Sequence, residues 1–186
     1  MINRTKEYIL EVFNNMLKSS TMEKITVEGI CREAKIAKST FYKYYLDKYD
    51  IMNYNYKLLI DTSIKSRDDY TWEELFKAIL DFMESHSKEM SESFETQGIN
   101  CFNRFMYNYS YDLVETTSHI VRNGQGLTPQ EAFQTSVFCH GAVDMTNDWL
   151  ENKYNLSSAA AAGLLVPMLP PSLRALSPRL VPNTLG

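Results

Sequence analysis

Residues 26–52 read TVEGICREAKIAKSTFYKYYLDKYDIM, and this stretch predicts two short helices, joined by a tight turn and followed by the start of a third. Apolar residues recur at helical spacing in the first of these helices, at Val27, Ile30, Cys31 and Ala34. The second helix carries Phe41, Tyr44 and Tyr45 on one side. Its other side offers hydroxyl and ammonium groups and no carboxylate, from Lys38, Ser39, Thr40, Tyr42 and Lys43. A short helix that rests on a partner helix and presents such groups is suited to the major groove of DNA.

The run KSTFYKYY at residues 38–45, with KYDIM at residues 48–52, resembles the recognition-helix signature of TetR-type bacterial transcriptional regulators. The resemblance covers about a quarter of the chain, and the register, the turn length and the following lysine all agree with the signature. The chain departs from it at three positions. Lys35 stands where the family often has a turn glycine, Ala37 where a capping serine is common, and Tyr45 where phenylalanine is usual. The resemblance implies a helix-turn-helix head and a helical body that dimerises.

The resemblance also implies which residues contact DNA. Thr40 and Tyr42 are expected at phosphates or base edges, and Lys38 and Ser39 nearest to the bases. Lys48, in the first turn of its helix, is expected to meet a phosphate. Thr26 can cap its own helix, and it can also meet a phosphate there. For any single residue the alternative is an ordinary solvated surface position. The candidate DNA contacts are Thr26, Lys38, Ser39, Thr40, Tyr42, Lys43, Tyr44 and Lys48.

Charge is distributed unevenly along the chain. The 186 residues carry a net charge of −4, which by itself argues against a nucleic-acid binder. Residues 1–57, however, hold ten Lys and Arg against seven Asp and Glu, whereas the remaining residues hold nine against sixteen. A small basic part followed by an acidic part is typical of a DNA-binding domain that is joined to a domain of another kind.

The pattern of apolar residues predicts helices throughout, so the expected fold class is all-α. Two Ser/Thr-x-x-Glu capping boxes, Thr71 to Glu74 and Thr128 to Glu131, predict the starts of two longer helices. We expect a helix-turn-helix domain at residues 1–50 and a helical effector-binding and dimerisation domain at residues 51–156. Residues 157–186 are rich in proline and are expected to form one short helix and then an irregular tail.

The sequence contains no recognisable catalytic or metal-binding motif. His86, His119 and His140 lack the spacing of metal ligands, and there is no Gly-rich phosphate loop, nucleophile elbow or paired-carboxylate motif. We therefore expect no enzyme activity, no cofactor and no metal. No apolar stretch approaches the roughly 20 residues of a membrane span, and the first residues lack the apolar segment of a signal peptide. The three isolated cysteines predict reduced thiols, so the expected compartment is the cytoplasm.

Two regions of the body invite a functional interpretation. The first is rich in aromatic residues, which can form an ordinary core or line an effector pocket, and the pocket candidates are Phe82, Phe102, Phe105, Met106, Tyr109 and Phe138. The second is the helix that follows Thr128, where small and apolar residues lie along one ridge. The resemblance implies that this helix takes part in a four-helix dimer interface, with Gly141, Met145 and Trp149 as the candidate contacts.

These patterns predict a homodimeric, DNA-binding transcriptional regulator, in particular a repressor that a small-molecule effector releases from a palindromic operator. The rival hypothesis is a TetR-like co-regulator whose body binds a partner protein instead of a small ligand. A closed apolar cavity in the body would favour the small ligand, and an exposed apolar patch would favour the protein partner.

Overall fold

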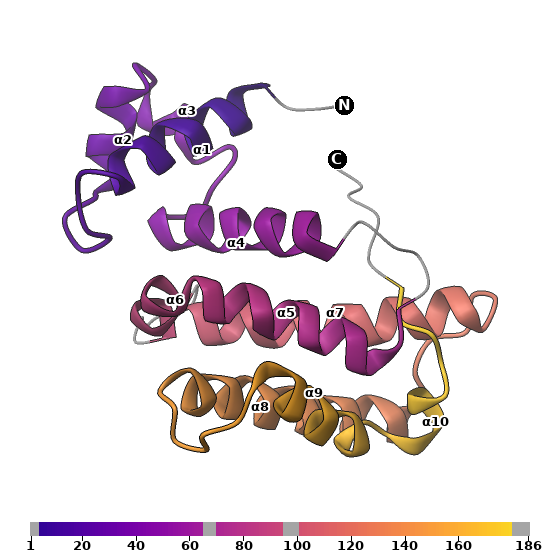
Figure 1. The fold of residues 1–186 in the computed structure, drawn as a ribbon. Coiled ribbons are helices and arrows are strands. Elements are labelled where there is room, and N and C mark those ends of the chain that lie inside the picture. Colours follow the sequence, from indigo (N-terminus) through magenta and orange to yellow (C-terminus); the bar gives the residue numbers. More distant parts are fainter. Residues whose placement is uncertain (1–3, 65–69, 95–100, 180–186) are drawn as a thin grey trace. The chain divides into compact units, whose positions relative to one another are not determined.

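The computed structural model of the chain describes residues 4–64, 70–94 and 101–179 (Figure 1). Every regular element within these ranges is helical, which confirms the predicted all-α fold class. The elements are α1 (Arg4–Leu17), α2 (Val27–Glu33), α3 (Lys38–Phe41), α4 (Lys48–Ile64), α5 (Trp72–Ser85), α6 (Ser87–Phe94), α7 (Phe102–Val121), α8 (Pro129–Leu150), α9 (Ser158–Leu165), the 3-10 turn η1 (Val166–Met168) and α10 (Pro171–Arg174).

The chain divides into two compact units. The described residues up to Lys57 form the first unit, called the head below, and those from Leu58 onward form the second, called the body. The division falls inside α4, so this helix contributes residues to both units.

The head surrounds a small apolar core. Phe13 of α1, Ile30 of α2 and Phe41 of α3 are fully buried in it. The hydroxyl oxygen of Thr26 accepts a hydrogen bond from the backbone N–H of Gly29 at 3.0 Å, which confirms the prediction that Thr26 caps α2. The cap fixes where α2 begins, and the core fixes which of its faces points inward.

The turn between α2 and α3 depends on one residue in an unfavourable conformation. Lys35 has a φ of 53°, in the left-handed region that residues with a Cβ atom rarely adopt. This conformation allows the N–H of Lys35 to reach the carbonyl of Arg32 at 3.2 Å, and the N–H of Ile36 to reach the carbonyl of Cys31 at 3.0 Å. The two bonds form a Schellman motif that ends α2. Glycine, which the family often has here, makes the same turn without the steric cost.

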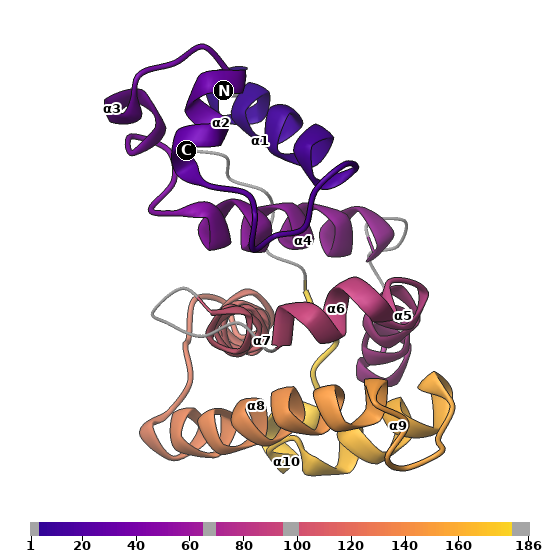
Figure 2. The same ribbon diagram turned by 90° about the vertical axis from the view of Figure 1, so that its left-hand side faces the viewer.

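The helices of the body pack in pairs, α5 against α9 and α7 against α8 (Figures 1 and 2). α5 and α8 begin at the two predicted capping boxes. The N–H of Glu74 donates to the Thr71 hydroxyl oxygen at 3.2 Å, and the N–H of Thr71 donates to the Glu74 carboxylate at 2.9 Å. Thr128 and Glu131 make the same reciprocal pair, so both predicted helix starts are confirmed.

The C-terminal segment differs from the sequence prediction. The sequence predicts one short helix up to about Val166 and an irregular tail after it, whereas this tail includes η1 and α10. Leu169 and Leu173 are buried, and the indole N–H of Trp72 donates to the carbonyl oxygen of Leu173 at 3.1 Å. The prolines are compatible with these elements because they occupy the first positions of each, where no intrahelical N–H bond is needed. The segment is therefore part of the body core.

Glu131 joins three helices of the body. Its carboxylate accepts two hydrogen bonds from the guanidinium of Arg122, at 2.8 and 3.0 Å, and a third from the hydroxyl of Ser172. Arg122, with Ser172 and the Thr128 cap, holds the pKa of this carboxyl well below its usual range. Because Glu131 is buried, the paired guanidinium is what makes its charge tolerable there.

Replacing Lys35 with glycine should stabilise the head by about 0.5–1 kcal/mol. The loss of left-handed strain stabilises the folded head, and this gain is larger than the opposing gain of entropy in the unfolded chain. Native-state hydrogen exchange of the α1–α3 amides measures the change. Lys35→Ala is the matched control, since it keeps the Cβ atom and the strain, and it should change the free energy of opening by less than about 0.5 kcal/mol. Equal values for the two variants would contradict a role for the left-handed conformation.

Candidate DNA-binding face and body groove

The segment that contains α3 is held by its apolar side. Phe41 is fully buried, Tyr45 is nearly so, and the Tyr45 hydroxyl donates to the carbonyl oxygen of Lys6 at 3.0 Å. Burial of the Tyr45 phenol raises its pKa above the usual range. Ala37 stands at the N-cap of α3 without a side-chain hydrogen bond to the helix, as its sequence implies. Core contacts therefore hold this segment in place.

The polar candidates of the same segment are exposed or half-buried, in contrast to Phe41 and Tyr45. Lys38, Ser39, Tyr42 and Lys43 are exposed, and Thr40 and Tyr44 are half-buried. The Tyr42 side chain is 55% exposed, and its ring meets the buried ring of Phe41 edge-on at 5.3 Å. Of the eight residues predicted to contact DNA, six are thus brought together on the α3 segment.

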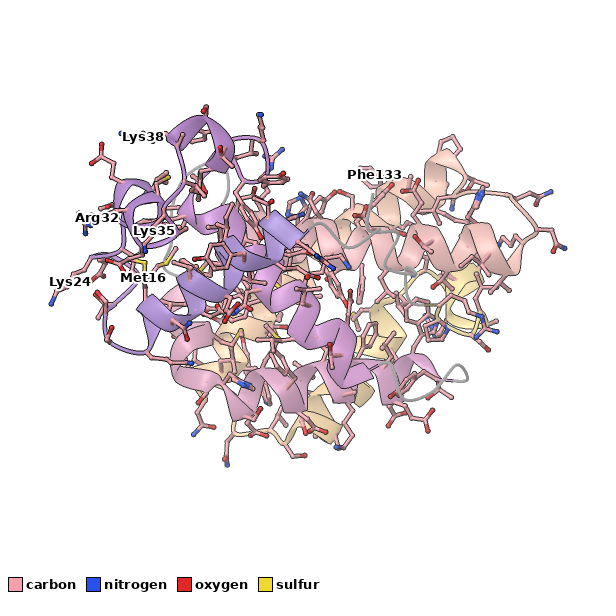
Figure 3. The ribbon with its side chains drawn as sticks, turned by 90° about the horizontal axis from the view of Figure 1, so that it is seen from above. Met16, Lys24, Arg32, Lys35, Lys38 and Phe133 are labelled. Carbon is pink, nitrogen blue, oxygen red and sulfur yellow. The ribbon has the colours of Figure 1, made fainter. Side chains whose placement is uncertain are left out.

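Further basic residues accompany this face. Figure 3 shows Lys24, Arg32 and Lys35 projecting from the same side of the head as Lys38. All of these residues are exposed. These three residues add to the basic charge of the head, but they are not among the predicted DNA contacts because they lie outside the recognition-helix run at residues 38–45. They add basic side chains to this side of the head outside α3.

One of the candidate contacts is already engaged in an ion pair. The ammonium of Lys38 donates to the carboxylate of Glu28, which lies in the first turn of α2. The hydrogen bond from Lys38 lowers the pKa of the Glu28 carboxyl, and the same bond raises the pKa of the Lys38 ammonium. The sequence placed these residues ten positions apart and gave no indication of the pair.

The ammonium of Lys48 is directed to backbone carbonyl oxygens, whereas the predicted phosphate contact requires it to face DNA. Its ammonium donates to the backbone carbonyl oxygens of Met22, Glu23 and Ile25, at 2.8, 3.3 and 3.0 Å. These contacts tie the start of α4 to the loop before α2. The hydroxyl of Thr26 likewise serves the α2 cap. Phosphate contacts by either residue stay predictions, and in this structure both side chains hold the head together.

The pocket candidates in the body separate into two groups. Met106, Tyr109 and Phe138 line a cavity of about 50 Å³ between α5, α7 and α8. Phe82, Phe102 and Phe105 are not among the described residues that line it. The Phe82 ring is tilted against the His86 ring, with the ring centroids 4.5 Å apart, and Phe102 packs edge-on against Phe94 with centroids 4.9 Å apart. This volume suits a few water molecules, whereas sites for drug-sized ligands measure roughly 300–1,000 Å³.

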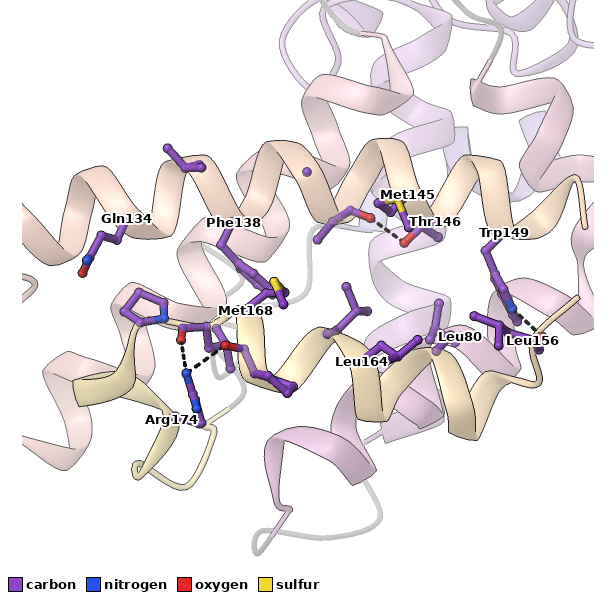
Figure 4. Close-up of a pocket in the computed structure, with 18 of the residues that line it drawn as sticks. Leu80, Gln134, Phe138, Met145, Thr146, Trp149, Leu156, Leu164, Met168 and Arg174 are labelled. Atoms are coloured by element: carbon purple, nitrogen blue, oxygen red, sulfur yellow. Dashed lines mark hydrogen bonds between the residues drawn. The ribbon is translucent and has the colours of Figure 1, made fainter. Parts of the chain in front are cut away.

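A much larger apolar groove, of about 810 Å³, runs along α8, between this helix and the segment that contains α9, η1 and α10 (Figure 4). Gly141, Met145 and Trp149, the three predicted dimer contacts, all line it. Figure 4 shows Phe138 and Trp149 of α8 facing the segment of α9 and η1 that carries Leu164 and Met168. The Trp149 indole N–H donates to the carbonyl oxygen of Leu156 at 2.8 Å, which fixes the ring at one end of the groove.

Large apolar side chains are exposed around this groove. On α8, Phe133 is 73% exposed, and Val137 and Met145 are also exposed. Leu164 and Met168, which follow in the chain, are exposed as well. Phe133, Val137, Gly141 and Met145 are spaced by four residues, so they form a single ridge along α8. A contiguous apolar surface of this kind marks an interaction site.

The described residues contain neither a candidate metal site nor a candidate membrane-spanning helix. Within these ranges no group of three or more His, Cys, Asp or Glu side chains is arranged to hold a metal ion. No helix in the described part of the chain has the length and apolar character needed to cross a membrane.

Lys48→Met should destabilise the head by about 1–2 kcal/mol, because the carbonyl oxygens of the loop before α2 lose a charged donor. Hydrogen exchange of the amides in residues 22–33 reports the loss. Lys43→Met is the control, since Lys43 is exposed on α3, and it should stay within about 0.5 kcal/mol of the parent chain. A Lys48→Met protein with unchanged exchange would show that these hydrogen bonds do not stabilise the head.

One solved structure of a known protein agrees with the fold. A solved structure of the dihydroxyacetone kinase operon activator DhaS is similar, with a TM-score of 0.54 and 16% identity, covering 93% of this chain and 98% of that one. The fatty acid degradation regulator FadR from Bacillus halodurans gives a TM-score of 0.41 and 13% identity, covering 90% of this chain and 94% of that one. Among curated proteins, no sequence matches the chain.

The body also matches a known family directly. A TetR family model described as the transcriptional regulator C-terminal region matches residues 70–170, which is more than half of the chain. The match begins just before α5 and ends between η1 and α10, so it includes the small cavity and all of the groove lining except Pro171 and Arg174. It lies outside the head, where the recognition-helix resemblance was found. The chain therefore belongs to the TetR family of transcriptional regulators.

Proposed function

We propose that this regulator acts as a homodimer that binds operator DNA through α3 of each head. The observation that carries the proposal is the two-sided α3 segment. Its apolar side, with Phe41 and Tyr45, is buried in the head, and its exposed side carries Lys38, Ser39 and Tyr42 without a carboxylate of its own. Hydroxyl and ammonium groups on an exposed helix suit phosphates and base edges.

The second copy in the proposed dimer covers the groove along α8. Three features support this occupant. The ridge of Phe133, Val137, Gly141 and Met145 repeats at the four-residue interval by which helices interdigitate. Nothing lies within 4 Å of a Cβ atom placed on Gly141, so a second helix can approach the backbone closely there. The ridge also lacks charged residues, so two copies can meet across a two-fold axis without burying like charges.

A two-fold dimer implies a palindromic operator, because each head reads one half-site. We propose repression as the outcome, since a dimer that occupies its operator excludes other proteins from that DNA. The structurally similar DhaS is named an operon activator, so a reporter gene should be used to test the sign of regulation. Lower reporter activity when the regulator is present supports repression, and higher activity supports activation.

Release by a small effector would use the cavity lined by Met106, Tyr109 and Phe138. With a volume of about 50 Å³, this cavity must expand before it can hold a typical ligand. That observation favours the second candidate, a body that responds to a partner protein. Thermal unfolding separates the two, because a small ligand raises the melting temperature of the purified dimer by mass action without any partner protein.

Tyr42→Ala should weaken binding to DNA that flanks the gene by about tenfold, because an exposed polar contact of α3 is removed. Stability should change by less than about 0.5 kcal/mol. A gel shift repeated across salt concentrations measures the affinity. Tyr8→Ala is the matched control, because Tyr8 is an exposed tyrosine of the same head on α1. Equal affinities for the two variants would remove α3 from the binding face.

Gly141→Leu should convert the protein to a monomer, because each copy inserts a bulky side chain at the centre of the shared ridge. The monomer should tolerate the change, since the space around Gly141 is open and leucine favours a helix. Sedimentation at micromolar concentration measures the state of assembly. Gly126→Leu, at another open glycine outside the groove, should leave it unchanged. An intact Gly141→Leu dimer would place the interface elsewhere.

A further inference from the structure

We propose that Glu28 sets the DNA affinity of the head by holding the ammonium of Lys38. The inference rests on the proposed function, because it requires α3 to face DNA. The carboxylate of Glu28 binds a predicted DNA contact directly. The ammonium of Lys38 must therefore leave the Glu28 carboxylate before it can bind DNA.

The fold brings the two residues together. Glu28 is the second residue of α2, Lys38 is the first residue of α3, and the turn through Lys35 reverses the chain between them. Their side chains are 71% and 55% exposed, so the pair lies on the surface and within reach of a docked duplex. An exposed ion pair of this kind contributes little to folding stability. Its consequence is therefore expected in binding.

DNA competes with Glu28 for the same donor. A phosphate or a base acceptor can engage Lys38 only if the ammonium leaves the carboxylate or shares its hydrogens with it. Glu28 lies within hydrogen-bond distance of that ammonium, so its own negative charge stays close to the phosphates and repels them. Both effects lower affinity, and the first operates only while Lys38 is present.

Glu33 provides an internal comparison. It lies on the same helix, α2, is also exposed, and approaches Arg32 at 4.0 Å. Neither residue of that pair belongs to α3. Removing the charge of Glu33 changes the net charge of the head by the same amount as removing that of Glu28, but it leaves the Lys38 pair intact.

A double-mutant cycle on the full-length protein tests the mechanism. The variants are Glu28→Gln, Lys38→Met and the double variant, with Glu33→Gln as the control. The probe is a mixed-sequence DNA duplex at low salt, on which binding is almost entirely electrostatic and needs no knowledge of the operator. Glu28→Gln should bind about three- to tenfold more tightly than the parent, with a salt slope steeper by up to about one unit. Glu33→Gln should change affinity by less than about twofold, because Arg32 lies outside α3 and its 4.0 Å contact with Glu33 is too long to be a hydrogen bond that DNA must break.

The cycle gives a result for each link of the inference. If the affinity gain of Glu28→Gln disappears in the Lys38→Met background, Glu28 acts through Lys38 as proposed. A gain of the same size in that background, or an equal gain from Glu33→Gln, means that bulk charge repulsion is the cause and overturns the mechanism. A parent protein that binds the duplex while Glu28→Gln binds no better overturns this inference alone. A parent protein that binds no duplex at low salt overturns the proposed function as well.

Discussion

The candidate DNA-binding face depends on the burial of Phe41. α3 has four residues, and a helix of this length has no stability of its own in water. Phe41 is fully buried and Tyr45 bonds to the backbone of α1, so the apolar side of the segment anchors it to the rest of the head. The polar residues between these anchors are positioned by contacts that they do not make themselves. The order of the exposed polar side chains therefore depends on the packing of the head core behind them.

Helix starts could be predicted from the sequence where neighbouring residues decide them. Thr26, Thr71 and Thr128 each cap a helix through a backbone N–H three residues away, and all three caps are present. The C-terminal segment was mispredicted because its partners are distant. Leu173 is ordered by Trp72, which lies 101 residues earlier, and no local pattern reports such a contact. α6 was not predicted either, because Met90 and Phe94 are too few to give a clear helical period.

In the candidate sites, too, contacts within one helix could be predicted from the sequence, and contacts between distant segments could not. Helical spacing placed Gly141, Met145 and Trp149 along one groove, because residues four apart share a face of a helix. Spacing could not show that Lys48 would find its acceptors in the loop before α2, or that Lys38 would meet Glu28. Nor could it separate Tyr109, which lines the small cavity, from Phe102, which packs in the core. The type of a residue shows which interactions its side chain can make, and the fold determines which residue is its partner.

The contacts of the last described residues determine the order in which the protein can fold during synthesis. All described residues of the head precede residue 58, so its core can close early as the chain leaves the ribosome. α5 follows soon after but must wait for its partners, because Ala162 packs beside Leu80 and Leu173 accepts the Trp72 indole N–H. Contacts of such long sequence separation form slowly. The nascent protein therefore has a folded head while the apolar side of α5 is still exposed. During that interval the exposed side of α5 is a binding site for chaperones.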